Sequence, residues 1–175
     1  MTRDRIEQII HECLKELLKK DSNLLKNDVS ERTITHKLAE YLQDRIPNLN
    51  VDCEYNRNYE LGERVEKILY VLNIERKEKI RSGLLEEDDL LAISTYPDII
   101  VHRRMTNAKN LLVIEVKKKN SRVSRDHDFK KLRAFTDSSN RNLYHYKYGV
   151  FILLDTGTRK LEKPELTWFI NGSVE

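Results

Sequence analysis

The stretches that decide the fold are Tyr96-Pro97-Asp98-Ile99-Ile100-Val101-His102 and Asn110-Leu111-Leu112-Val113-Ile114-Glu115-Val116-Lys117, near the middle of this 175-residue chain. Both are rich in β-branched and apolar residues, a composition that favours strands, and the run Asn107-Ala108-Lys109-Asn110 between them is typical of a turn. Pro97 suits the first residue of a strand. The sequence therefore predicts a β-hairpin with Asp98 entering the first strand and Glu115 near the end of the second.

Charged side chains of this hairpin are expected on one face. Because side chains alternate along a strand, Glu115 and Lys117 project to the same side and Val116 to the other. Val113 shares the face of Glu115, which fits a central strand that is buried on both faces. Two carboxylates, Asp98 and Glu115, converging with a lysine suit metal-assisted hydrolysis of a phosphodiester. The alternative is that Glu115 and Lys117 are ordinary exposed residues at a strand end.

The arrangement Pro97-Asp98, followed after 16 residues by Glu115-Val116-Lys117, resembles the signature of the PD-(D/E)XK nuclease superfamily, which includes restriction endonucleases and Holliday junction resolvases. The resemblance implies a magnesium-dependent nuclease, with manganese able to substitute. Asp98 and Glu115 would be hard oxygen ligands of the metal, which would act as a Lewis acid on the phosphate. The backbone carbonyl of Val116 would add a ligand, and Lys117 would orient or deprotonate the attacking water.

A second segment adds to this resemblance. Ser30-Glu31-Arg32-Thr33-Ile34-Thr35-His36-Lys37-Leu38 is similar to the Glu-Arg opening of the first core helix in resolvase-like members. By that likeness Glu31 is a fourth acidic residue and a further metal ligand. The alternative is that a glutamate in the first helical turn is favoured by the helix dipole alone. Glu40, on the same helix, is the substitute if Glu31 faces away.

Basic residues follow the hairpin. Between positions 101 and 135 eleven Lys and Arg stand against three acids, although the whole chain carries a net charge of only +3. Such a block is typical of phosphate-backbone binding, and the alternative is a solvated face. Lys131 either contacts the scissile phosphate or is exposed, and exposure is favoured; Asp128 either holds Lys131 or caps its helix. The candidate nucleic-acid-binding residues are Lys118, Lys119, Arg122, Arg125 and Lys131.

Hydrophobic periodicity organises the rest of the chain. Residues 5–19 predict an amphipathic helix, and residues 21–28 a polar connector. Ser30 predicts the N-cap of a helix that ends near residue 45. Further predictions are a strand at 50–57, a helical stretch at 63–81, a mobile acidic loop at 86–89, a helix at 126–136, and strands at 148–154 and 166–170.

These elements predict one nuclease-like domain over residues 1–175, with an extra N-terminal helix and an insertion at 58–92. The expected class is α/β: a restriction endonuclease-like core of αβββαβ order, in which helices flank a mixed sheet. Tyr144, Tyr146 and Tyr148 alternate, which suits strand packing or, alternatively, base stacking.

Composition narrows the setting. The two cysteines, Cys13 and Cys53, have neither disulfide-framework nor zinc-site spacing. No signal peptide and no apolar run of membrane-spanning length are found, so we expect a cytoplasmic protein without a membrane partner. The expected partner is nucleic acid, with DNA favoured; the sequence leaves a homodimer open. Two alternatives to an enzyme remain: a nuclease-like module that binds nucleic acid or protein without cleaving, and a structural interaction domain.

Overall fold

The computed structural model describes residues 1–55, 57–60, 63–66, 68–72, 90–139 and 144–175. The helices are α1 (Arg3–Lys20), α2 (Ser22–Lys26), α3 (Glu31–Arg45) and α5 (Asp126–Thr136). The strands are β1 (Asn50–Cys53), β2 (Arg57–Glu60), β3 (Glu63–Glu66), β4 (Ile68–Leu72), β5 (Leu90–Ser94), β6 (Ile99–His102), β7 (Leu112–Lys118), β8 (Tyr148–Leu154), β9 (Glu165–Ile170) and β10 (Ser173–Val174).

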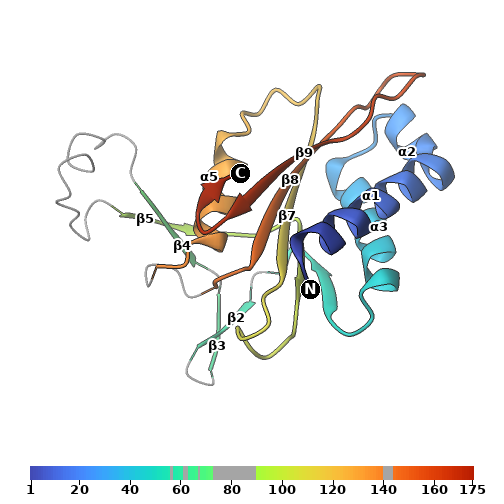
Figure 1. Cartoon of the computed structure of the whole chain (residues 1–175). Coiled ribbons are helices and arrows are strands. Elements are labelled where there is room, and N and C mark those ends of the chain that lie inside the picture. The colour runs from blue at the N-terminus through green and yellow to red at the C-terminus, as the bar shows by residue number, and fades with distance from the viewer. Residues whose placement is uncertain (56, 61–62, 67, 73–89, 140–143) are drawn as a thin grey trace.

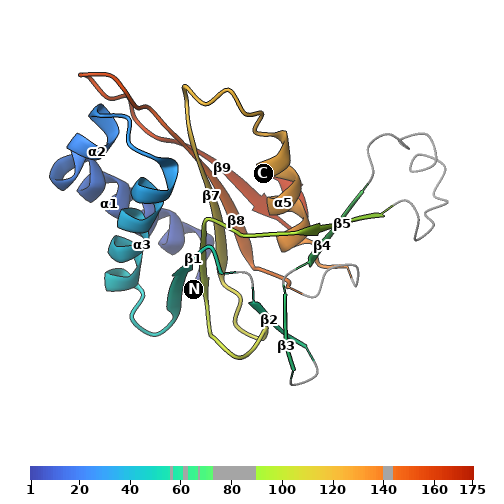
Figure 2. The same ribbon diagram turned by 180° about the vertical axis from the view of Figure 1, so that it is seen from behind.

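A mixed six-stranded sheet forms the centre of the molecule, in the order β1-β6-β7-β8-β9-β10. Neighbouring strands are antiparallel except β7 and β8, which are parallel and are connected through α5. Helices α1, α2 and α3 cover one face, and α5 covers the other (Figures 1 and 2). The α/β class and the mixed sheet flanked by helices are therefore confirmed.

Strand β7 contributes side chains to two hydrophobic cores, one on each face of the sheet. Ile114 and Val116 belong to the core on the α1 and α3 side, and Val113 belongs to the core beneath α5. Every residue of β7 from Leu112 to Val116 is buried, as expected for a central strand. Glu115 has the parity of Val113 and so faces α5. The strand thus delivers a carboxylate into the layer between the sheet and that helix.

Three of the four predicted helices are present, with small changes at their ends. The apolar face of α1 is buried except for the half-buried Leu18, and the helix spans two residues more at its start and one more at its end than predicted. Ser30 caps α3, its Oγ accepting from the Thr33 N–H at 3.2 Å. The expected connector at 21–28 instead contains the short helix α2, which buries Leu25. The helix at 126–136 and the strand at 148–154 have the predicted bounds.

The segment between β1 and β6 differs from its prediction. Strand β1 ends at Cys53, and Glu54 follows in a left-handed backbone conformation with φ of 49°. The helix expected at 63–81 is wrong over its described part, because β3 pairs with β2 and β4 pairs with β5 as hairpins. The apolar run Ile68-Leu69-Tyr70-Val71-Leu72 suits a short strand, whereas the surrounding charges had favoured a helix. Residues 73–81 and the acidic loop at 86–89 lie outside the described residues.

Three further observations bear on the sequence predictions. Tyr144, Tyr146 and Tyr148 are buried, so the base-stacking alternative is wrong and packing holds. Cys13 and Cys53 carry free thiols. In the part of the chain that the structure describes, no helix is both long enough and apolar enough to cross a membrane.

Candidate functional site

Sheet register brings Asp98 and Glu115 together. Strands β6 and β7 pair Ile99 with Ile114 and Ile100 with Val113, so the next opposite pair in this register is Asp98 and Glu115. Residues directly opposite each other in an antiparallel pair lie on the same face. Both carboxylates therefore belong to the α5 face, as the alternation pattern predicted. A placement on opposite faces would have ended the nuclease interpretation.

Two carboxylates accept backbone N–H groups near the end of β7, past the residues that pair with β6. The Val116 N–H donates to Asp98 Oδ2 at 2.7 Å, and the Lys118 N–H donates to Glu31 Oε1 at 3.2 Å. Because the N–H and C=O of a strand residue point to the same edge, the Val116 carbonyl faces this edge too. Asp98, Glu31 and the Val116 carbonyl thus meet along one stretch of β7. The N-terminal position of Glu31 on α3 lets it reach this edge from the opposite face of the sheet.

Glu115 is a charged residue in the core, only 1% exposed. Its Oε2 lies 2.5 Å from the Lys131 ammonium, and its Oε1 is buried and has no hydrogen-bond partner within the described chain. Burial, reinforced by the charge of Asp98, raises the pKa of Glu115 well above its usual range, and Lys131 opposes that rise. Burial likewise raises the pKa of Asp98 to about 6, against the Val116 N–H, which lowers it. The exposed-strand-end alternative for Glu115 is therefore wrong.

Two lysines share one aspartate beside this pair. Lys117 Nζ lies 2.9 Å from Asp128 Oδ2, and Lys131 Nζ lies 3.8 Å from Asp128 Oδ1. The prediction that Lys131 is exposed is wrong: its side chain points toward the sheet, where it contacts Glu115, and the residue is only 8% exposed. Asp128 holds both lysines from the first turn of α5. The i, i+3 spacing of Asp128 and Lys131 is a sequence signal for their contact on a helix. The ion pair between Lys131 and Glu115 depends on the burial of both side chains, which the spacing does not reveal.

Glu31 rather than Glu40 borders the site. Glu40 pairs with Lys37 at 2.5 Å and with His36 at 3.3 Å on the exposed side of α3. Glu54, which follows the first strand, pairs with Arg32 at 2.7 Å and is also exposed. Neither of these two glutamates has a described contact with Glu115.

The donor set fits magnesium in type. Among the described residues no group of three or more His, Cys, Asp and Glu is gathered closely enough to form a ready metal cage. Magnesium, however, keeps several waters and is commonly held by one or two carboxylates. The unpartnered, buried Oε1 of Glu115 is the kind of oxygen that such an ion would satisfy. Asp98, Glu115, Glu31 and the Val116 carbonyl are all oxygen donors, so the residues fit the ion.

The predicted nucleic-acid-binding residues fall into two groups. Lys118 contacts Asp28 at 2.9 Å and the Val29 carbonyl at 3.2 Å. Lys119 pairs with Glu162 at 2.8 Å and Glu165 at 2.5 Å. These two lysines and Lys131 are thus held by contacts within the protein. Arg122 and Arg125 are exposed, on the loop between β7 and α5.

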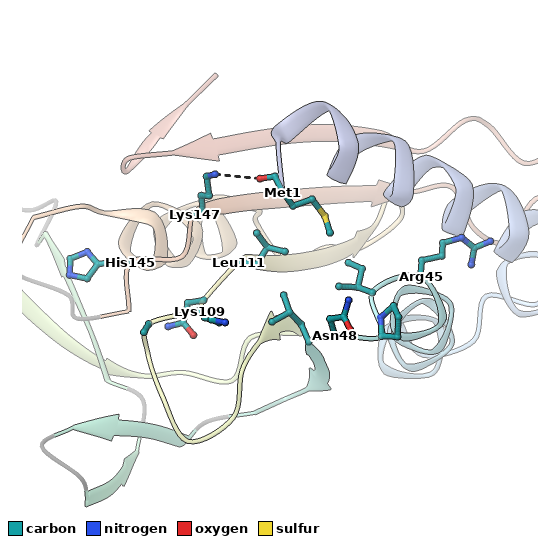
Figure 3. A pocket seen from close by; sticks show the side chains of 12 residues that line it. Met1, Arg45, Asn48, Lys109, Leu111, His145 and Lys147 are labelled. Carbon is teal, nitrogen blue, oxygen red and sulfur yellow. Dashed lines mark hydrogen bonds between the residues drawn. The ribbon is translucent and has the colours of Figure 1, made fainter.

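A pocket lies away from these carboxylates, on the side of the sheet where the β6–β7 turn meets the end of α3 (Figure 3). Its volume is about 490 Å³. Its lining includes Met1, Arg45, Leu111, His145 and Lys147, and Lys147 Nζ donates to the Met1 carbonyl at 3.3 Å. None of the predicted site residues lines it. The candidate site is therefore the charged layer beneath α5 and the adjoining strand edge, not this pocket.

Comparison of the chain with protein-family models, with curated proteins and with solved structures finds no match.

Proposed function

We propose that this protein is a magnesium-dependent nuclease that hydrolyses phosphodiester bonds, with DNA as the favoured substrate. The observation that carries the proposal is the pairing of Asp98 opposite Glu115, with a buried and unpartnered Glu115 oxygen, at the strand edge that Glu31 also reaches. The order α3, β1, β6, β7, α5, β8 supports the resemblance to the PD-(D/E)XK superfamily, because it follows the expected αβββαβ core.

Each site residue has a role that follows from its chemistry. Asp98, Glu115 and the Val116 carbonyl would hold the ion, with Glu31 beside them. When bound, magnesium would supply Lewis-acid activation of the scissile phosphate. Lys117 would orient the attacking water or take its proton, and its ammonium would offset the negative charge that develops in the transition state. Asp128 positions Lys117 through their 2.9 Å ion pair.

A second candidate is a nuclease-fold module that binds nucleic acid or a protein partner without cleaving. One observation favours it: Lys131 and Lys117 are both paired to carboxylates, so the protein's own side chains neutralise part of the charged layer. Against it stands the burial of Glu115 beside the half-buried Asp98, because two neighbouring acids with little solvent cost stability and have no evident purpose in a protein that only binds.

Cleavage assays separate the two candidates. Plasmid, linear, single-stranded and branched DNA and RNA would be incubated with the protein in magnesium or in EDTA. We expect magnesium-dependent cleavage of at least one substrate, and a loss of about 100-fold or more in Glu115→Gln. Glu54→Gln, which alters an exposed glutamate, is the matched control and should cleave like the wild type. A folded wild type that binds DNA but leaves every substrate intact would establish the binding module instead.

A further inference from the structure

In the described part of the chain, the acids Asp98, Glu115 and Asp128 and the bases Lys117 and Lys131 lie together in the layer between the sheet and α5. Lys131 lies between two of the acids, 2.5 Å from Glu115 Oε2 and 3.8 Å from Asp128 Oδ1. Lys117 contacts the other oxygen of Asp128, Oδ2, at 2.9 Å. Asp128 therefore offers Lys131 a second carboxylate oxygen on the same helix.

Lys131 provides the positive charge that buried Glu115 and its half-buried neighbour Asp98 need. Asp98 and Glu115 face each other across β6 and β7, and ionising both in a poorly solvated layer is costly. The Lys131 ammonium offsets this cost by direct contact with Glu115. The pairing is incomplete, however, because Glu115 Oε1 has no described partner although it is fully buried. The acids thus keep one oxygen that a cation other than Lys131 would satisfy.

A divalent cation at this oxygen would repel the ammonium. Lys131 contacts one oxygen of the Glu115 carboxylate, and the cation would contact the other, so two positive charges would lie a few ångströms apart. Lys131 is a flexible side chain with rotatable bonds, and Asp128 is already nearby. A small movement of its ammonium would exchange one carboxylate partner for another without leaving the charge unpaired.

We propose that Lys131 is a resident counter-ion of the acid pair that transfers its ammonium from Glu115 to Asp128 when a divalent cation binds. The inference rests on the proposed function, because it assigns Lys131 a role in the metal site of that enzyme. In this exchange Lys131 competes with the cation for Glu115, and Asp128 receives the Lys131 ammonium. Lys131 is then a positioning and regulating residue, distinct from Lys117.

If Lys131 competes with the cation, removing its ammonium should raise the affinity for the cation, whereas removing a residue that only supports the fold should not. Lys131→Met removes the ammonium and keeps most of the aliphatic length. The cation-free variant should be less stable than the wild type, because the acids lose their counter-charge. Manganese or magnesium should nevertheless bind it more tightly, by about tenfold or more, because the repulsion is gone. Its unfolding temperature should therefore rise more on adding the ion than that of the wild type.

The experiment is titration calorimetry with manganese and magnesium, together with thermal unfolding with and without each ion. It compares the wild type with Lys131→Met, Lys131→Arg and Asp128→Asn. Lys131→Arg keeps the charge and should resemble the wild type. Asp128→Asn keeps the Lys131–Glu115 pair but removes the receiving carboxylate, so it should bind the ions more weakly. This variant also tests the proposal if Lys131→Met does not fold.

Each outcome decides a different claim. Tighter binding by Lys131→Met, or weaker binding by Asp128→Asn, supports the exchange. If the wild type binds manganese but Lys131→Met binds it equally or less well, and Asp128→Asn is unchanged, the exchange is overturned and the proposed metal site stands. If neither the wild type nor any variant binds either ion, the metal site of the proposed function is overturned along with the exchange.

Discussion

At Asp98, burial opposes ionisation. The pKa of Asp98 is raised to about 6 by burial, although the Val116 N–H donates to it, whereas an unfolded chain gives an aspartate about 3.9. The folded protein therefore binds the proton more tightly than the unfolded chain. Ionised Asp98 costs folding stability above pH 6, by about 3 kcal/mol at most, and the cost fades as the pH falls from about 6 toward 4.

Asp98→Asn tests that sign. Asparagine keeps an oxygen that accepts from the Val116 N–H but removes the charge. In EDTA at pH 7.5 the variant should be more stable than the wild type, and the gain should fall to about half at pH 5. Urea unfolding at the two pH values measures it. Asp126→Asn, at an exposed aspartate of α5, is the matched control; an equal gain there, or a gain that grows toward pH 5, would contradict the account.

At the scale of residues, the sequence predicts on which face of the sheet a side chain lies better than it predicts which side chain it contacts. Alternation along β7 places Glu115 on the face opposite Val116, and the register confirms it opposite Asp98. That inference needed only the period of a strand. The contact between Lys131 and Glu115 needed the rotation of α5 over the sheet and the burial of Glu115, both of which depend on the whole core. Local pattern carries no such information.

At the scale of elements, α5 packs closely on β8. A methyl group added at Gly149 would lie 3.0 Å from Thr136 Cγ2, 3.2 Å from Phe169 Cβ and 3.3 Å from Leu132 Cδ2. Two of these neighbours belong to α5, the helix that holds Lys131 and Asp128. Only a residue without a side chain allows this separation between the helix and the sheet.

Gly149→Ala should therefore destabilise the protein by roughly 1–3 kcal/mol, since extra volume in a packed layer forces its neighbours to move. Adding Thr136→Ser removes the atom closest to the new methyl while keeping the hydroxyl, which donates to the Leu132 carbonyl at 2.8 Å. The double variant should recover part of the loss relative to Thr136→Ser alone. Chemical denaturation of the four proteins measures this coupling. Fully additive effects would show that the crowding lies elsewhere.

Elements with a strong hydrophobic period were predicted correctly, whereas the helix predicted at 63–81 is wrong over its described part. Helix α5 and strand β8 follow clear patterns with good boundaries, and Ser30 marks the start of α3. Between β1 and β6 short apolar runs alternate with charges, and charge alone favoured a helix. Hairpin pairing decides in favour of strands there, because β4 gains its backbone partners from β5. That pairing joins residues distant in sequence, which local periodicity does not detect.

Across the whole molecule, which has a net charge of +3, the predicted nucleic-acid-binding residues differ in whether acidic residues of the protein already pair with them. Lys118 and Lys119 are held by acids of other segments, so they tie the end of β7 to the residues preceding α3 and to the β8–β9 region. The basic block predicted from sequence is thus partly structural. Arg122 and Arg125 remain exposed on the loop that leaves β7 directly after the candidate catalytic residues. If the proposed function holds, these two arginines, of the five predicted nucleic-acid-binding residues, are the pair exposed for contact with a phosphate backbone.

Reversing Arg122 and Arg125 to glutamate should weaken DNA binding and make it less dependent on salt. Each phosphate contact releases a counterion from the duplex, so the logarithm of the binding constant falls with the logarithm of salt concentration by about 0.9 per contact. Loss of both contacts should reduce that slope by about 2. Fluorescence anisotropy with labelled duplex from low to moderate salt, in EDTA to prevent cleavage, measures it. Lys15→Glu with Lys19→Glu makes the same charge change at exposed positions of α1, the helix on the sheet face opposite α5 (Figure 2). An equal decrease in slope for both double variants would mean that the DNA responds to total charge and that the loop is not its binding surface.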